Sequence, residues 1–130
     1  MKFLDTSFLI DILRNIPEAV ALLDELEQDP HVTSAINLHE FLVGAYGSRN
    51  IKDELKARKK LINKIIVLPF DNLAAEESAL IENKLRTTGE LIGTADILIA
   101  GIMKRNGIKE IITRNTKHFE KIEGIEITSY

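Results

Sequence analysis

Short apolar runs alternate with longer amphipathic segments along almost the whole chain, and this alternation limits the fold more than any other feature. In the longer segments apolar side chains recur at helical spacing, as Leu38, Phe41 and Ala45 do. Strands that alternate with helices are joined by right-handed crossovers, which place the strands in a parallel sheet with helices on both faces. The sequence therefore predicts an α/β fold.

The boundaries of the expected elements follow from apolar periodicity and capping residues. The predicted strands are Lys2–Asp5, His31–Thr33, Ile65–Leu68, Glu110–Thr113 and Ile125–Thr128. The predicted helices are Ser7–Arg14, a segment that begins near Pro17, Asn37–Gly47, Ile51–Asn63, Asp71–Thr87 and Thr94–Arg105. Thr6 or Ser7 is expected to cap the first helix, and Asn106-Gly107 to end the last helix in a left-handed turn. The continuous apolar run Ile65–Leu68 predicts a strand buried on both faces.

Composition excludes several classes of protein. A chain of 130 residues with 45% apolar residues has the size and composition of one globular domain, expected over residues 1–130. The absence of cysteine excludes disulfides, zinc thiolates and thiol catalysis. The absence of tryptophan and the low aromatic content argue against a base-stacking platform. The formal net charge of −3 argues against a general nucleic-acid binder.

No targeting or membrane segment is expected. The charged residue Asp5 comes so soon after Met1 that the apolar segment of a signal peptide has no room before it. The apolar run Ile97–Met103 is far shorter than the ~20 residues that span a bilayer. A cytoplasmic protein without a membrane anchor is the prediction.

Polar side chains stand where the predicted strands end, and ligands of parallel sheets bind at that edge. Asp5 ends the first strand, Glu40 lies in the helix after the second, Asp96 begins the most apolar helix and Asn115 follows the fourth strand. Each alone has an ordinary structural interpretation: a turn or cap, a solvated helix position, or a carboxylate favoured by the helix dipole. Together, oxygen ligands without cysteine suit a hard cation such as Mg²⁺ or Mn²⁺. Such an ion lowers the pKa of a bound water and neutralises charge on a phosphodiester.

Four segments in this order resemble the motifs of the PIN-domain ribonucleases, and most closely the VapC-type toxins of type II toxin–antitoxin systems. The segments are Phe3–Ile10 (FLDTSFLI), Ile36–Ala45 (INLHEFLVGA), Ile92–Gly101 (IGTADILIAG) and Ile112–Phe119 (ITRNTKHF). The resemblance covers nearly the whole chain. It implies a single PIN-like domain whose five-stranded, mostly parallel sheet is flanked by helices on both faces.

The resemblance also implies an activity: a Mg²⁺- or Mn²⁺-dependent endoribonuclease. Carried over by position, Asp5, Glu40 and Asp96 would be the acidic metal-site residues. Asn115 stands where many members of the family have an aspartate, which favours one firmly bound ion over two. Metal-activated water would attack phosphorus in line and leave a 5′-phosphate and a 3′-hydroxyl.

Further residues are expected to support this site. Thr6 and Thr113 are candidates to hydrogen-bond and orient the carboxylates. A metal-free route would need paired histidines, but His31, His39 and His118 lie in three separate motifs, so this route is less favoured.

The resemblance further implies partners. These are an RNA substrate, with transfer or ribosomal RNA as candidates, a VapB-type antitoxin that inserts a segment near the acidic pocket, and a second copy of the chain in a homodimer.

Two basic segments are either solvated helix surface or contacts for RNA phosphates. Their cationic residues are Lys52, Lys56, Arg58, Lys59, Lys60 and Lys64 in the first segment, and Lys104, Arg105, Lys109, Arg114, Lys117 and Lys121 in the second. Arg114 lies inside the last motif and is therefore the predicted RNA contact.

Other functions remain open at this point. A PIN fold that has lost turnover and acts as an interaction module is supported by Asn115 and opposed by the three acids Asp5, Glu40 and Asp96. A phosphoacceptor receiver would need paired acids after the first strand, where Asp5 stands alone. A nucleotide-binding domain is excluded because the chain has no Gly-x-Gly-x-x-Gly and no Gly-Lys-Ser/Thr.

Overall fold

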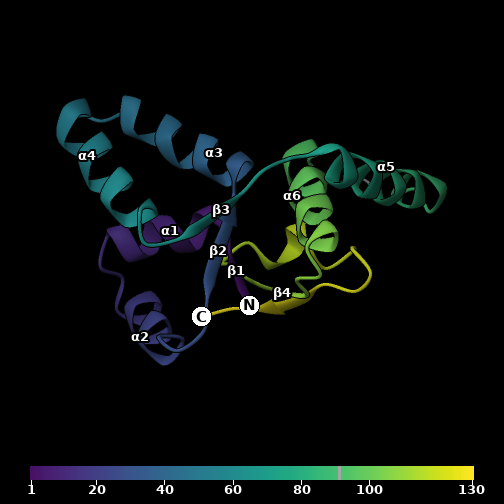
Figure 1. Cartoon of the computed structure of the whole chain (residues 1–130), viewed down its shortest axis with the longest axis horizontal. Helices are drawn as coiled ribbons and strands as arrows, with labels where there is room; N and C mark the ends of the chain where they lie inside the picture. The colour runs from purple at the N-terminus through teal and green to yellow at the C-terminus, as the bar shows by residue number, and fades with distance from the viewer. Residues whose placement is uncertain (91) are drawn as a thin grey trace.

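The computed structural model describes residues 1–90 and 92–130. Over these residues the alternating pattern folds into one sheet of five strands with six α-helices around it (Figure 1). The elements are β1 (Lys2–Leu4), α1 (Thr6–Leu13), α2 (Pro17–Glu25), β2 (His31–Ser34), α3 (Ala35–Tyr46), α4 (Ile51–Ile62), β3 (Ile66–Leu68), α5 (Asn72–Thr87), α6 (Thr94–Arg105), β4 (Glu110–Ile112), the 3-10 turn η1 (Thr116–His118) and β5 (Glu126–Thr128). Every predicted strand and helix is present, and the ends agree within two residues except at the end of α2, which stops at Glu25 and not at Asp29-Pro30. Among the described residues, no helix has both the length and the apolar character needed to cross a bilayer.

All strand pairs are parallel, and the strand order is β3-β2-β1-β4-β5. β2 lies on one side of β1, and β3 lies beyond β2. The next strand along the chain, β4, lies on the other side of β1. The order therefore reverses between β1 and β4, where ligands of open α/β sheets bind. Leu4 pairs with Ile112, and the Asp5 N–H donates to the Ile112 carbonyl at 3.0 Å. The residues that follow these two strands are thus neighbours.

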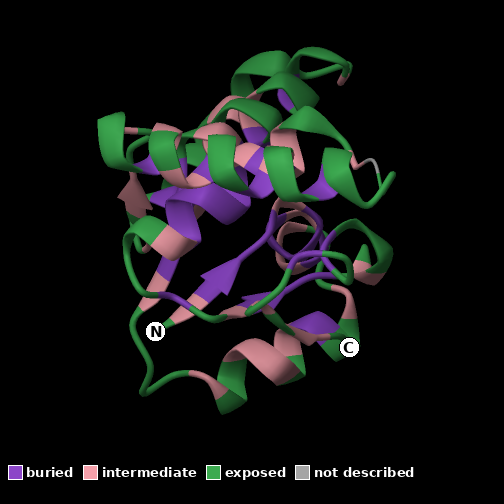
Figure 2. Ribbon diagram, turned by 90° about the vertical axis from the view of Figure 1, so that its right-hand side faces the viewer, coloured by how far each residue is buried: buried purple, intermediate pink, exposed green. Residues whose placement is uncertain are grey.

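Two apolar cores cover the two faces of the sheet, because successive side chains of a strand point to opposite sides. Phe3 and Ile111 face the core formed with α5 and α6. Leu4 and Ile112 face the other core, where Phe8 of α1 packs among residues from α2, α3 and α4. Figure 2 shows the buried strands between covering helices whose outer surfaces are exposed. This arrangement confirms the predicted α/β class with helices on both faces.

The prediction that the third strand is buried on both faces is wrong. β3 lies at the edge of the sheet and pairs with β2 alone. Ile66 is 52% exposed, while Val67 and Leu68 are half-buried. A continuous apolar run is typical of central parallel strands, but it does not distinguish a central position from an edge.

The start of α1 also differs from the prediction. The helix begins at Thr6, so Asp5 takes the N-cap position expected of Thr6 or Ser7. The Asp5 side chain makes no capping hydrogen bond, which leaves its carboxylate free for contacts with other elements. The left-handed turn after α6 is present, with Gly107 at φ 66°.

Candidate active site

Asp5 is the innermost carboxylate at the carboxyl edge of the sheet. It is 5% exposed. Its Oδ1 accepts a hydrogen bond from Asn37 Nδ2 at 3.0 Å, and its Oδ2 accepts one from Thr113 Oγ1 at 2.7 Å. Burial raises the pKa of Asp5 above its ordinary value, and these hydrogen bonds act against that rise. Both oxygens are therefore held in fixed positions by the loop after β4 and by α3.

Glu40 is connected to Asp5 through two polar side chains. Its Oε1 accepts from Thr6 Oγ1 at 2.7 Å, and Thr6 Oγ1 in turn accepts from Asn37 Nδ2 at 2.9 Å. Ser34 donates to Asn37 Oδ1 at 2.6 Å and caps α3 by accepting from the Asn37 N–H. The amide of Asn37 is thus fixed, with its Nδ2 directed at both Asp5 and Thr6.

Asn37 is a site residue that sequence reasoning did not identify. It is fully buried and touches two predicted site residues. A signal was available, since Asn37 lies three residues before Glu40 and positions three apart share one side of a helix.

Asp96 lies in the first turn of α6 and is half-buried. Its Oδ2 is 3.2 Å from His118 Nδ1. Burial raises the pKa of Asp96 above its ordinary value, the negative charges of Asp5 and Glu40 raise it further, and His118 lowers it. The charges of Asp5 and Glu40 therefore both act on the Asp96 carboxylate.

His118 is a second residue that the sequence did not assign to the site. The structure places it on η1, beside Asp96, although the two residues belong to different motifs. The η1 turn itself was not predicted. Its ring is half exposed, so a group bound at Asp96 could also meet the imidazole.

Asn115 and Thr113 come from the loop after β4. Thr113 is fully buried, and its Oγ1 accepts from the Asn115 N–H at 3.0 Å while donating to Asp5. Asn115 is exposed and takes the N-cap position of η1 without a side-chain capping bond. The backbone thus brings Asn115 to the mouth of the site, and a ligand role for its amide oxygen stays a prediction.

The residues fit a hard divalent cation in their chemistry, although they do not form a closed cage. Carboxylates that converge and repel one another are the ligands that Mg²⁺ and Mn²⁺ prefer. As the side chains stand, no three His, Asp or Glu residues of the described chain are gathered closely enough to hold a metal ion. Glu40 already accepts a hydrogen bond from Thr6, and Asp96 is already in contact with His118. A cation would have to compete with these two contacts, while Asp5 is already in place.

Arg114, the predicted RNA contact, is held beside α1. The Arg114 Nη1 atom lies 3.1 Å from Asp11 Oδ1, and the backbone N–H of Arg114 donates to Ser7 Oγ at 3.0 Å. The Asp11 side chain is 4% exposed and also accepts from the Tyr130 hydroxyl at 2.5 Å. Burial raises the pKa of that Tyr130 hydroxyl, and the hydrogen bond to Asp11 adds to the rise. The Arg114 side chain is still 55% exposed, so part of its guanidinium faces solvent.

Comparisons with known proteins agree with this arrangement. Residues 2–125 match the family described as PIN domain. The chain is 32% identical over 126 residues to a tRNA(fMet)-specific endonuclease VapC of Shigella flexneri, covering 96% of this chain and 95% of that protein. It is 29% identical over 126 residues to Ribonuclease VapC1 of Haemophilus influenzae strain R2866, covering 95% and 92%. A chain of a DNA-bound VapBC structure from Salmonella typhimurium superposes with a TM-score of 0.88 at 30% identity, covering 98% of this chain and 96% of that one. The chain therefore belongs to the PIN domain family, among its VapC-type toxins.

Proposed function

We propose that this protein is a Mg²⁺- or Mn²⁺-dependent endoribonuclease that hydrolyses RNA phosphodiester bonds as the toxin of a toxin–antitoxin pair. The observation that carries the proposal is the convergence of Asp5, Glu40 and Asp96 at the point where the strand order reverses. Relatives with about the same length are named as endonuclease and ribonuclease VapC. The interaction module without turnover is not favoured, because all three acids are present and the charges of Asp5 and Glu40 both act on Asp96.

The different burial of the three carboxylates suggests a different role for each in the proposed reaction. A divalent cation held by Asp5, Asp96 and Glu40 would supply water activation and charge neutralisation at the phosphodiester. Asp5 is fixed by Asn37 and Thr113, so it sets the position of the site. Glu40 is exposed and Asp96 half-buried, so these two carboxylates are the ones that can reach substrate and accept a proton from the attacking water.

The proposed partners follow from the same relatives. Solved structures of VapBC complexes from Salmonella typhimurium and Haemophilus influenzae contain toxins 30% and 27% identical to this chain. We therefore propose a VapB-type antitoxin as partner and RNA as substrate, with transfer RNA as the first candidate because one relative is named as specific for tRNA(fMet). The homodimer and the cytoplasmic location stay predictions.

Metal dependence and product chemistry test the proposal directly. We expect the purified protein to cleave total RNA in Mg²⁺ or Mn²⁺ and to stop when EDTA is added, because the carboxylates alone cannot neutralise the phosphodiester. The products should end in a 5′-phosphate and a 3′-hydroxyl. Mass spectrometry of the fragments checks the ends, and a 2′,3′-cyclic phosphate or cleavage that survives EDTA would contradict the proposed chemistry.

Replacing Arg114 tests its predicted RNA contact. We expect Arg114→Ala to weaken RNA binding and to reduce the slope of log K against log salt by about 0.7–0.9, the value for one lost phosphate contact. Binding titrations at several KCl concentrations measure the slope. Arg114→Lys is the matched control, because it keeps the charge while changing the ion pair with Asp11. An unchanged slope in the alanine variant would show that Arg114 serves only to hold Asp11.

A further inference from the structure

The charges of α4 are separated onto two sides of the helix. One side carries Arg58 and Ile62, which are both buried. The other side carries four lysines and lines a shallow concave surface, completed by Leu55 and Asn63. We call these four lysines the lysine face: Lys52, Lys56, Lys59 and Lys60. All four are exposed.

Helical geometry places the lysine face opposite the core. At about 100° per residue, the four lysines fall within an arc of about 100° centred roughly opposite Arg58. Ion pairing does not involve them. In residues 1–90 and 92–130 none of the four forms an ion pair. The acids of α4 are engaged locally, since Glu54 pairs with Arg58 and Asp53 binds Asn50.

Stability of the helix does not account for the lysine face. A cation in the last turn of a helix is favoured by the helix dipole, and this explains Lys59 and Lys60. Lys52 lies in the first turn, where the dipole disfavours a positive charge. Lys52 and Lys56 also extend a row of like charges at helical spacing, which is destabilising. Asp53, three residues before Lys56, offsets part of this repulsion, and an anion bound from outside would offset the rest.

The chemistry of the lysine face favours RNA over a protein partner. Lysine is depleted in protein interfaces, which are enriched in aromatic and arginine side chains. Among the described residues that line this surface, Leu55 is the only apolar one. Phosphate backbones require little more than mobile cationic groups, and lysines supply them without reading sequence. Because the whole chain has a net charge of −3, the attraction for RNA must be local.

The position of α4 sets the size of RNA that could use the lysine face. α4 packs beside α3, the helix that carries Glu40, and the two rise together from the sheet in Figure 1. The lysine face points away from that contact, so a helix diameter of about 10 Å lies between it and the rest of the molecule. An RNA must therefore extend beyond the cleaved bond to reach it.

We propose that the lysine face is a second RNA-binding surface that holds the phosphate backbone of a large, folded substrate at a distance from the acidic site. This inference rests on the proposed ribonuclease function. It predicts that the protein discriminates RNA by length: a transfer RNA engages both surfaces, and a short oligoribonucleotide engages the acidic site alone.

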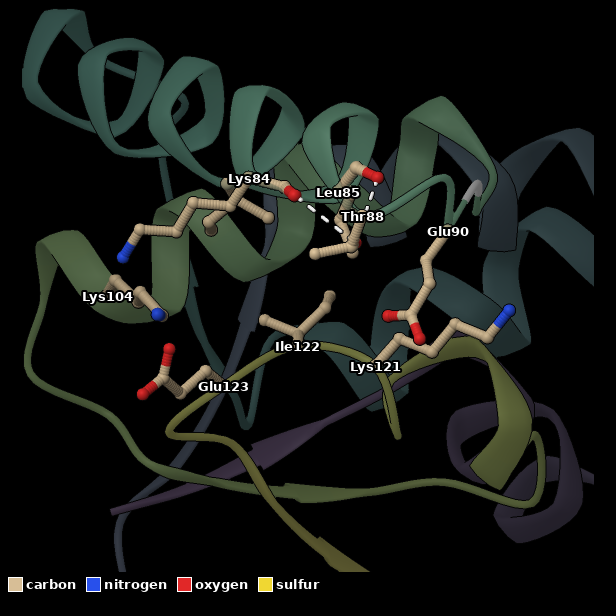
Figure 3. A pocket seen from close by; sticks show the side chains of 9 residues that line it. Lys84, Leu85, Thr88, Glu90, Lys104, Lys121, Ile122 and Glu123 are labelled. Carbon is tan, nitrogen blue, oxygen red and sulfur yellow. Dashed lines mark hydrogen bonds between the residues drawn. The ribbon is translucent and has the colours of Figure 1, made fainter.

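A second lysine-lined hollow provides the matched control. It lies between α5, α6 and the loop before β5, and its lysines are Lys84, Lys104 and Lys121. Figure 3 shows Glu90 and Glu123 among these lysines, so two of the three positive charges are offset within the hollow. Lys104 and Lys121 belong to the second basic segment, so the control pair is Lys84 and Arg86 of α5. Removing these two charges changes the net charge of the protein as much as removing two from the lysine face.

The test compares Lys56→Gln/Lys60→Gln with Lys84→Gln/Arg86→Gln. Binding of labelled transfer RNA is measured in EDTA over a range of KCl, which makes the result independent of cleavage. The lysine-face variant is expected to bind more weakly and to lose about 1.4–1.8 from its salt slope, as two phosphate contacts would require. The control variant should keep the wild-type slope. In Mg²⁺, the lysine-face variant should have a raised KM for transfer RNA and unchanged kinetics on the short oligoribonucleotide.

Three results would overturn the inference. The first is an unchanged salt slope in the lysine-face variant, and the second is an equal loss of slope in the control variant. The third is a lysine-face variant that binds RNA like the wild type but no longer binds a VapB-type antitoxin, which would make α4 a protein interface. Failure of the ribonuclease proposal is seen separately, as wild-type protein that binds transfer RNA with the lysine-dependent slope but cleaves nothing in Mg²⁺.

Discussion

Asp96→Asn is expected to lower RNA cleavage by at least about 100-fold while the fold is retained. Replacing groups that only support a metal ligand typically costs 10–100-fold, so losing a ligand should cost no less. The exchange keeps the size of the side chain and removes its charge. It also replaces the acceptor that His118 contacts at Oδ2 with an amide. Single-turnover cleavage in Mg²⁺ measures the loss.

The same variant is expected to be more stable than the wild type in metal-free buffer. Burial and the charges of Asp5 and Glu40 raise the pKa of Asp96 in the folded protein, so the folded state binds this proton more tightly than the unfolded state. Stability is then lost as pH rises from the unfolded value of about 3.9 through the raised folded value. Asparagine does not ionise, so the variant escapes this loss and its advantage persists at neutral pH.

Thermal unfolding in EDTA at pH 4 and pH 7 checks this second effect. The difference in melting temperature between variant and wild type should increase toward pH 7. Asp24→Asn, an equivalent exchange at an exposed position of α2, is the control and should change neither cleavage nor this difference. A variant that loses cleavage and also melts lower at pH 7 would show that Asp96 has a structural role instead.

The predictable part of the site is the part set by chain topology. Asp5 follows β1 and Asn115 follows β4, and the carboxyl ends of adjacent parallel strands meet at one edge of a sheet. Strand positions read from apolar runs are therefore enough to bring these residues to one place. The burial of β3 was not predictable in this way, because Ile66 would be buried only if another strand lay beyond it.

The contacts between side chains depend on packing that no local pattern encodes. Asn37 reaches Asp5 across 32 positions in the chain. His118 reaches Asp96 because a 3-10 turn carries it there, and that turn has no apolar periodicity of its own. The buried Asp11 side chain similarly accepts a hydrogen bond from Tyr130, which lies 119 positions away. The sequence thus predicts which strand ends meet, and the packing determines which hydrogen bonds form between them.

Packing at the crossing of α5 and α6 gives the largest expected loss of stability. Gly101 lies on the buried side of α6, where the two helices are in close contact. A Cβ atom at this position would lie 2.6 Å from Ser78 Cβ, 2.8 Å from the Ala74 carbonyl oxygen and 2.9 Å from the Ser78 nitrogen. Two of these atoms belong to the backbone of α5, so no side-chain rotation relieves the overlap.

Gly101→Ala is therefore expected to destabilise the protein by about 2 kcal/mol and to lower its melting temperature by about 6–10 °C. Overpacking of this kind costs ~1–3 kcal/mol or more, and the gain of up to ~1 kcal/mol from replacing glycine inside a helix offsets only part of it. Gly47→Ala is the matched control, because its Cβ would meet only the Gly44 carbonyl oxygen, at 3.8 Å. Denaturant unfolding of both variants gives the comparison. Equal stabilities would mean that α5 and α6 can separate at their crossing without cost, since helix propensity favours alanine at Gly101 and Gly47 lies at the end of α3.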